Sequence, residues 1–260
     1  MDIYAKYLDI NEAPINSPVD NKRPFFMTLE EVREMILYRN KYNQDGVCWE
    51  SNIMDQIHEN KYGWFDFSKS LIDIGAGAGE YPIFAGFAHS YAFEPNRKKQ
   101  CLIYANMLSF DKMNDIDVFP YAIGETPGFK DFTGWSEDVN NSFHTEELHK
   151  IEFRTLDSFN FVNIGLIKAD IEGFELFAFR SGIGTIIRNN FPPLLIEIWN
   201  DRDINSYMKE NAPVYIERRN DLIRLLYGLG YIMIINPEFG DWETKFFIHT
   251  TQLNGYENPQ

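Results

Sequence analysis

Short apolar runs alternate with longer stretches of mixed character from Ser70 to Thr251. The runs are rich in the β-branched and aromatic residues that favour strands: SLIDIGA, YAFEP, DVFPYAIG, GLIKADIEG, PPLLIEIW, YIMIINP and TKFFIHTT. Helical stretches separate most of them, which is typical of a parallel sheet covered by helices on both faces. Only residues 238–243 separate the last two runs, too few for a crossover helix. The pattern predicts an α/β fold whose open, mostly parallel sheet ends in an antiparallel hairpin.

The chain before this alternation is patterned more weakly. Residues before Arg23 are polar and follow no sustained period, so we expect an irregular or partly ordered arm there. A capping-box sequence, Thr28-Leu29-Glu30-Glu31, begins a helix expected near 28–40, and apolar residues at helical spacing predict another that ends near Lys61.

Size and charge narrow the class of protein. With 260 residues, 44% of them hydrophobic, the chain is expected to fold as one structural unit. We divide it into residues 1–69, an N-terminal arm with lid helices, and residues 70–260, a ligand-binding domain. A formal charge of −15 repels phosphate backbones, so a nucleic-acid partner is not expected.

Cysteine usage and hydropathy indicate where the protein works. Cys48 and Cys101 lack the spacing of a disulfide framework or a zinc site, which fits reduced thiols. No apolar stretch approaches the length that spans a membrane, and the start of the sequence has no leader pattern. We therefore expect a soluble, cytoplasmic protein, and the oligomeric state stays open.

A glycine-rich loop follows the first strand. Leu71–Ile74 forms that strand, Gly75, Gly77 and Gly79 follow at alternate positions, and a helix begins near Glu80. In open parallel sheets ligands bind beyond the carboxyl ends of the strands, where glycines let the backbone approach them. The structural alternative is a tight turn that binds nothing. A dinucleotide fingerprint requires a third glycine where Glu80 stands, and a carboxylate there repels a pyrophosphate.

Glu94 is a second indication of a bound ligand. It ends the second strand, about 20 residues beyond the first glycine, where an acidic side chain accepts both hydroxyls of a ribose. Both NAD and S-adenosylmethionine carry such a ribose. The acidic surroundings of Asp73, Glu80 and Glu94 favour the cationic S-adenosylmethionine over a pyrophosphate. The structural alternative is a solvated carboxylate at a strand end.

Five segments in this order and spacing resemble the FkbM family of S-adenosylmethionine-dependent methyltransferases: IDIGAGAGEY, AFEPN, PYAIG, RTLDSF and IKADIEGFELF. The resemblance covers roughly residues 70–200. It implies a Rossmann-like class I methyltransferase fold with seven strands, and methyl transfer to a hydroxyl, commonly on a sugar or a polyketide ring. We expect a small-molecule or glycan acceptor, with a sugar or glycan precursor favoured.

The resemblance also implies which residues hold the cofactor. The methionine part lies against the loop after Asp73, the ribose against Glu94, and the adenine edge against Ala122 and Ile123. Glu50 precedes the first strand in a segment that can fold back as a lid, where its carboxylate can take the ammonium group. The expected cofactor-binding residues are Glu50, Asp73, Gly75, Ala76, Gly77, Gly79, Glu80, Glu94, Pro95, Ala122, Ile123 and Asp170. Gly77 is a departure, since the family often has Asn there.

The expected chemistry lies at the end of a later strand. Asp170 follows Ile167–Ala169 and should point into the crevice where the reactive methyl lies, which makes it the first candidate for general base. Lys168 and Glu172 would orient it or contact the acceptor, and His144, in a loop expected to hang over the site, is an alternative base. Both residues also have purely structural alternatives. Glu172 could lie in the first turn of a helix and complement its dipole, and Lys168 could pair with Glu197.

Other readings remain at this point. Asp170, Glu172 and Glu197 could hold a divalent cation, but three dispersed carboxylates do not favour a metal site. Trp199 and Tyr207, in loops or at strand ends, could stack on a sugar, and so could Trp135 and Phe143. Asp157 is expected to cap a short helix. The alternative functions are a non-catalytic cofactor-binding module and an NAD-dependent oxidoreductase.

Overall fold

The structure is a computed structural model of the chain, and it describes residues 13–16, 24–27, 51–132, 149–235 and 244–253. The expected helix over 28–40 lies outside these residues.

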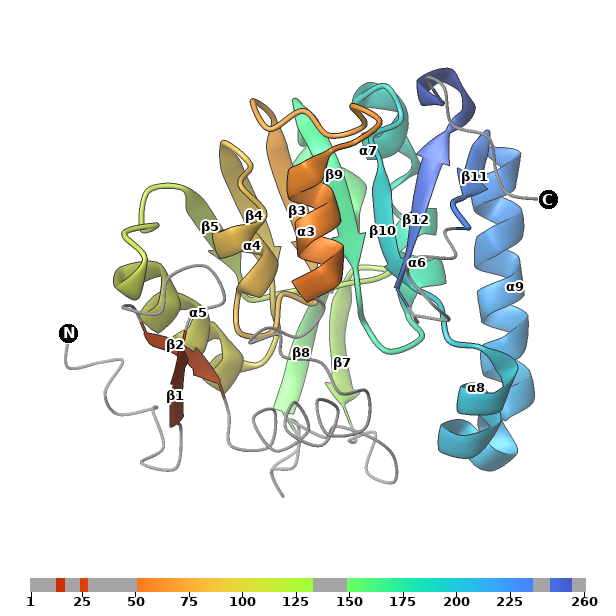
Figure 1. The fold of residues 1–260 in the computed structure, drawn as a ribbon. Coiled ribbons are helices and arrows are strands. Elements are labelled where there is room, and N and C mark those ends of the chain that lie inside the picture. The colour runs from red at the N-terminus through yellow and green to blue at the C-terminus, as the bar shows by residue number, and fades with distance from the viewer. Residues whose placement is uncertain (1–12, 17–23, 28–50, 133–148, 236–243, 254–260) are drawn as a thin grey trace.

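A seven-stranded sheet forms the centre of the molecule (Figure 1), in the order β11-β12-β10-β9-β3-β4-β5. Its strands are β3 (Ser70–Ile74), β4 (His89–Phe93), β5 (Ile116–Phe119), β9 (Ile164–Ala169), β10 (Leu194–Glu197), β11 (Tyr231–Met233) and β12 (Thr244–His249). β12 runs antiparallel to both β10 and β11, whereas the pairs from β10 to β5 are parallel. The expected mostly parallel sheet with a late antiparallel hairpin is confirmed.

Helices cover both faces of this sheet. One face carries α3 (Ser51–Glu59), α4 (Glu80–Phe84) and α5 (Arg97–Ser109), and the other carries α6 (Glu175–Arg180), α7 (Ile183–Arg188) and α9 (Ala212–Gly228). The strands are apolar toward both layers: Leu71 packs under the first group of helices, and the next residue, Ile72, packs under the second. α8 (Asp201–Met208) packs on α9 at the edge of the molecule.

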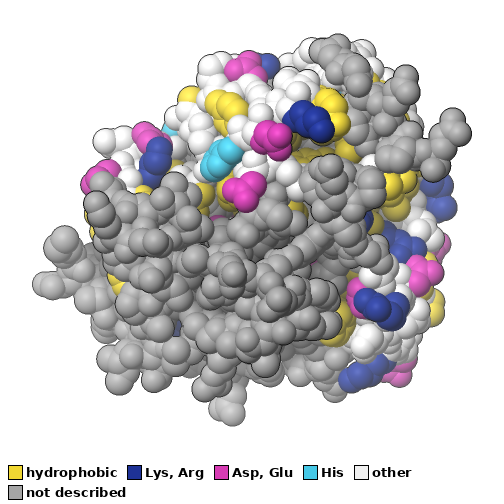
Figure 2. Space-filling view, viewed as in Figure 1, with side chains coloured by type: hydrophobic (Ala, Val, Ile, Leu, Met, Phe, Trp, Pro, Cys, Tyr) yellow, Lys and Arg dark blue, Asp and Glu magenta, His cyan; other side chains and the backbone are white. Residues whose placement is uncertain are grey.

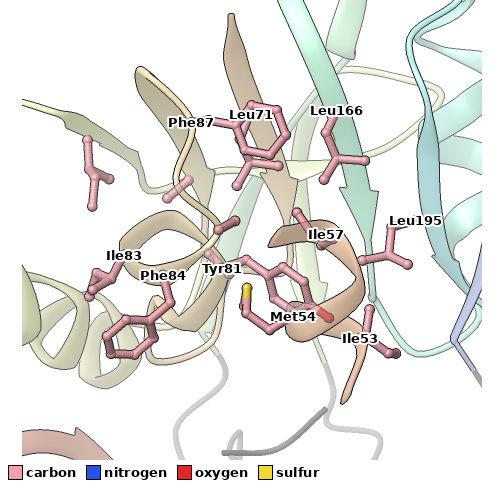
Figure 3. Packing of buried hydrophobic residues seen from close by; sticks show 14 of the residues in the cluster. Ile53, Met54, Ile57, Leu71, Tyr81, Ile83, Phe84, Phe87, Leu166 and Leu195 are labelled. Atoms are coloured by element: carbon pink, nitrogen blue, oxygen red, sulfur yellow. The ribbon is translucent and has the colours of Figure 1, made fainter. Parts of the chain in front are cut away.

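The core on the first face includes the helix that precedes the glycine loop. Figure 3 shows Ile57 of α3 and Tyr81 of α4 in the layer that lies over Leu71 and Leu166 of the sheet. Ile57, Leu71 and Leu166 are fully buried. Burial of this apolar surface stabilises the fold by roughly 25 cal/mol per Å². It therefore anchors α3 on the sheet, although α3 precedes the first strand of that sheet.

A second, three-stranded sheet lies below the first one in Figure 1 and consists of β6 (Ala122–Ile123), β8 (His149–Arg154) and β7 (Gly128–Phe132). The sequence pattern treated DVFPYAIG as one strand, whereas the structure divides it between the two sheets. Pro120 stands at the division. Because proline has no N–H to donate to a sheet ladder, the strand ends there and the chain turns into β6.

The N-terminal arm is more regular than its composition indicates. β1 (Ala13–Asn16) and β2 (Pro24–Met27) pair as antiparallel strands, so the segment before Arg23, expected as an irregular or partly ordered arm, contains a strand. Asn106 of α5 fixes β2 to the domain. Its Oδ1 accepts from the backbone N–H of Phe26 at 2.6 Å, and its Nδ2 donates to the Phe26 carbonyl at 3.0 Å.

Charged side chains of both signs lie close together on the surface. Figure 2 shows Lys and Arg beside Asp and Glu along the right-hand edge, where Figure 1 places α8 and α9. Arg219 pairs with Asp201 at 2.6 Å there, and Arg224 pairs with Asp221. Of the helices that the structure describes, none combines the length and the apolar character that crossing a bilayer requires.

Candidate active site

Three neighbouring strands, β4, β3 and β9, carry the candidate residues at their carboxyl ends. The glycine loop follows β3, Glu94 follows β4, and Asp170 follows β9. Backbone hydrogen bonds tie the three together: Gly75 and Ala76 donate to the Phe93 carbonyl, and Asp170 donates to the Ile74 carbonyl, all at 3.0 Å. The order of the strands reverses at β3: β4 and β5 lie on one side of it, and the later strands β9 and β10 lie on the other. Ligands usually bind at such a reversal in open parallel sheets.

Two glycines of the loop have different surroundings. Gly75 has a φ of +83°, and a Cβ on it would lie 2.0 Å from the backbone oxygen of Asp170, so the chain packs there as closely as glycine allows. Gly77 has a φ of +55°, but a Cβ on it would meet nothing within 4 Å. The loop is thus closed beneath Gly75 and open beside Gly77, which is where a ligand can approach the backbone.

Glu94 is fixed over this loop. The side chain is buried, and its Oε2 accepts from the N–H of Gly77 at 3.0 Å while its Oε1 accepts from the N–H of Asn96 at 2.8 Å. These two bonds hold the carboxylate in one orientation beside the open part of the loop. Pro95, half-buried, follows it, and Glu80 is the first residue of α4, as expected.

A buried lysine lies between two aspartates. Nζ of Lys168 is 3.5 Å from Oδ1 of Asp73 and 3.4 Å from Oδ2 of Asp170, and it lies over the ring of Tyr81. Burial raises the pKa of Asp73, and the charge of Lys168 opposes that rise. The structural reading in which Lys168 pairs with Glu197 is therefore replaced by ion pairs with Asp73 and Asp170. Asp170 keeps 35% of its side chain exposed.

Glu172 is not part of a helix. It has a φ of +58° in the turn before α6, which begins at Glu175, so the expected place in a first helical turn is wrong. Glu175 takes that place instead. Its Oε1 accepts from the N–H groups of Ile171 and Gly173 at 2.8 and 3.2 Å, and burial raises its pKa to about 7. Sequence reasoning missed Glu175, whose signal was an acidic residue in the first turn of a helix.

Glu197 ends β10, next to β9 in the sheet. Its pKa is raised well above the ordinary value, because the side chain is desolvated and because Asp170, Glu172 and Glu175 carry like charges nearby. Despite this proximity, no three His, Cys, Asp or Glu side chains of the described residues are arranged to hold a metal ion.

The other candidates are spread more widely. Ala122 and Ile123 form β6, and Ile123 is buried in the same cluster as Ile74 and Phe93, near the ends of β3 and β4. Asp157 lies within the short 3-10 helix Leu156–Phe159 and does not cap it, but its oxygens accept from the N–H groups of Gly184 and Thr185 at the start of α7.

Two aromatic expectations turn out differently. Trp199 follows β10 but is buried, with its ring 5.8 Å from that of Tyr207. Tyr207 lies within α8 and not in a loop or at a strand end. Glu50, Trp135, Phe143 and His144 lie outside the described residues, so their roles stay predictions.

Comparison with known proteins adds a family match. Residues 59–232 match the family described as Methyltransferase FkbM domain. This range contains the glycine loop, Glu94, Asp170 and Glu197. A comparison with curated proteins found no match.

Several solved structures are similar to the chain. Methyltransferase FkbM from Methylobacillus flagellatus is 21% identical, with a TM-score of 0.49; the match covers 75% of this chain and 47% of that one, so the chain spans about half its length. Precorrin 8W decarboxylase from Methanobacterium thermoautotrophicum is 10% identical, with a TM-score of 0.43 and coverage of 71% and 74%. An rRNA methylase from Streptococcus thermophilus is 12% identical, with a TM-score of 0.41 and coverage of 75% and 92%.

Proposed function

The chain belongs to the FkbM family of S-adenosylmethionine-dependent methyltransferases, and we propose that it methylates a hydroxyl group on a sugar or glycan precursor. The carrying observation is the arrangement of Asp170, a partly exposed carboxylate that a buried lysine holds beside the glycine loop. A hydroxyl acceptor must lose its proton during transfer, and a positioned carboxylate is a suitable base.

The residues around the glycine loop fit S-adenosylmethionine. Gly77 leaves open space beside its backbone, and the carboxylate of Glu94 is oriented next to it, where it can accept from ribose hydroxyls. Asp73, buried at the end of β3 with Lys168 as its counter-charge, is proposed to border the methionine part of the ligand. When bound, this cofactor supplies an electrophilic methyl group.

Asp170 is our candidate for general base, with Lys168 in a positioning role. The ion pair at 3.4 Å restrains the carboxylate of Asp170 from the buried side, while its exposed part remains free to meet an acceptor. Restraint of this kind lowers the entropic cost of bringing acceptor and base together. Glu172 lies two residues further on and is a candidate contact for the acceptor. Ala122 and Ile123 are proposed to border the adenine.

Charge supports a neutral acceptor. The formal charge of the chain is −15, and Asp170, Glu172, Glu175 and Glu197 lie close enough together to influence one another. The negative potential of these groups repels a polyanion. Their carboxylate oxygens can accept hydrogen bonds from the hydroxyl groups of a polyol. A sugar or glycan precursor combines neutral charge with many hydroxyl groups.

The test separates cofactor binding from transfer. Calorimetry with S-adenosylhomocysteine should show binding that Glu94→Ala weakens at least tenfold. Incubation with S-adenosylmethionine and panels of free, nucleotide-linked and oligomeric sugars should give products heavier by one methylene group. Asp170→Asn should lower that rate by about 10²–10⁴ while leaving binding in place.

Each result has a distinct meaning. Binding without transfer to any sugar would contradict the acceptor class and favour a non-catalytic cofactor-binding module. Binding of NAD and not of S-adenosylhomocysteine would favour an oxidoreductase. Full transfer by Asp170→Asn would remove Asp170 from the role of base and leave methyl transfer standing.

A further inference from the structure

A hollow lies at the carboxyl end of β10, between that strand and the helices α6, α8 and α9. Glu175, Glu197, Trp199, Tyr215 and Arg218 are among the residues that line it. Its total volume is about 380 Å³, including the part open to solvent. The centres of water-sized groups can occupy only about 30 Å³ of it, enough for about two water molecules, so it fits a substituent of a ligand and not a whole ligand.

Two polar atoms among its lining residues have no hydrogen-bond partner among the described residues: Nε1 of Trp199 and Oε2 of Glu197. Both atoms are shielded from solvent, and the Trp199 side chain is only 8% exposed. They lie near each other, because a hydrogen-bonding contribution from Trp199 lowers the pKa of Glu197, but the geometry of the two atoms falls short of a hydrogen bond. An unpaired buried donor beside an unpaired buried acceptor is costly and requires an explanation.

The charges around the hollow select what can fill it. Glu175 and Glu197 both line it, and burial together with the charge of Asp170 raises the pKa of each carboxyl group, which favours the neutral form. Arg218 also lines the hollow and is held over the rings of Phe174, Phe177 and Tyr215. An anion would meet the carboxyl groups and a cation would meet the guanidinium group, so a neutral group is the better fit. A hydroxyl can accept from Trp199 and also interact with Glu197 as donor or acceptor.

The position of the hollow connects it to the candidate base. β10 and β9 are parallel neighbours, and Ile196 pairs with Ala169, so Glu197 and Asp170 are the next residues on adjacent strands. Adjacent strands lie about 4.8 Å apart. Carboxyl groups at two such ends can reach two hydroxyl groups of a single sugar ring.

We propose that this hollow binds a second hydroxyl group of a hexopyranoside acceptor, through Nε1 of Trp199 and the carboxyl group of Glu197. This assignment rests on the proposed function and deepens it, because it makes Glu197 and Trp199 the residues that select among acceptors. Asp170 acts on the hydroxyl that receives the methyl group, and this pair recognises another hydroxyl of the same ring.

The test observes the indole N–H of Trp199 directly. Protein labelled with ¹⁵N at its tryptophan indoles is titrated, with S-adenosylhomocysteine present, with methyl pyranosides of glucose, mannose and galactose. At least one should shift the Trp199 resonance, assigned with Trp199→Phe, in a saturable manner. The indole of Trp64, which stacks on Tyr62 away from the hollow, is the internal control and should stay in place.

Variants of Glu197 make the result specific. Glu197→Gln retains a donor and an acceptor and should preserve the shift, whereas Glu197→Leu should abolish it. If Glu197→Leu fails to fold, Trp199→Phe serves instead: it keeps an aromatic ring, loses the N–H, and should weaken the effective glycoside about tenfold in equilibrium dialysis.

Two outcomes would refute the proposed hydroxyl site. No shift of Trp199 with any of the three glycosides, or a shift that persists in Glu197→Leu, would refute this assignment and leave the hollow to water. The S-adenosylhomocysteine titration reports on the proposed function separately. Its failure would refute methyl transfer, whereas its success without a glycoside shift would refute only the hydroxyl site.

Discussion

Lys168 faces Asp73 across two neighbouring parallel strands, with Nζ 3.5 Å from Oδ1 and with 5% and 1% of the two side chains exposed. The two residues are register partners of β9 and β3. A charge this deep in the sheet is stable only with a partner, because desolvation disfavours the ionised form. The same lysine reaches Asp170, so one buried cation links the strand that carries the glycine loop to the strand that carries the candidate base.

Removal of Lys168 should therefore destabilise the protein strongly. Lys168→Met leaves Asp73 buried beside Asp170 without its counter-charge, and we expect a loss of about 3–5 kcal/mol in the free energy of unfolding. Urea denaturation measures it. The double variant with Asp73→Asn should lose much less than the sum of the two single changes. Additive losses would contradict the pairing.

A surface pair provides the control for this cycle. Lys112 and Asp115 lie 2.9 Å apart, with 34% and 43% of their side chains exposed. Lys112→Met should cost no more than about 1 kcal/mol, because solvent screens exposed ion pairs.

Substitution of two glycines of the loop by alanine should distinguish a glycine needed for packing from one needed for ligand binding. Gly75→Ala places a Cβ 2.0 Å from the Asp170 oxygen, so it should destabilise the fold by more than about 2 kcal/mol. Gly77→Ala meets open space and should cost only the roughly 1–2 kcal/mol of a positive φ, yet it should weaken S-adenosylhomocysteine binding. Thermal unfolding and calorimetry on the same samples check both. Unchanged binding by a folded Gly77→Ala would contradict a ligand beside that glycine.

Asn106 should control the docking of the arm. It is fully buried, bonds both backbone groups of Phe26, and donates to the Ala78 carbonyl of the glycine loop at 2.9 Å. Asn106→Leu removes these bonds, so the amide hydrogen of Phe26 should exchange at least tenfold faster. Hydrogen exchange resolved by NMR measures this rate. Asn205→Leu, on an exposed position of α8, is the matched control and should leave the rate unchanged.

Glu175 should make stability depend on pH. Its pKa rises from the ordinary 4.5 to about 7 in the folded chain, so the folded state binds this proton more tightly than the unfolded state does. The contribution of Glu175 is therefore fully present below pH 4.5 and is lost as pH rises through about 7. Glu175→Gln, which keeps an oxygen to accept from the backbone, should reduce this fall in the free energy of unfolding.

Urea denaturation at about pH 5 and about pH 8 checks the Glu175 prediction. Glu217→Gln, on an exposed position of α9, should retain the full pH dependence of the native chain. An unchanged slope in Glu175→Gln would show that Glu175 ionises normally in the folded state.

The order of the elements was readable from the sequence, because it depends on local signals. The sheet and its hairpin were predicted from patterns that span only a few residues each. These patterns are the strand-forming runs, the helical periods and the short link between the last two runs. Gly75, Gly77 and Glu94 lie at strand ends, and a parallel sheet brings such ends to one edge. The strand β1 was not predicted, since it depends on pairing with β2 and not on its own composition.

Only the tertiary structure decided how the charged residues pair. Lys168, Asp73 and Glu197 lie on three different strands, and which two meet depends on register and on the face to which each side chain points. The sequence determined that carboxylates gather at the ends of β9 and β10. Packing determined that Lys168 joins Asp73 and Asp170, because burial permits a charge only where a partner is within reach.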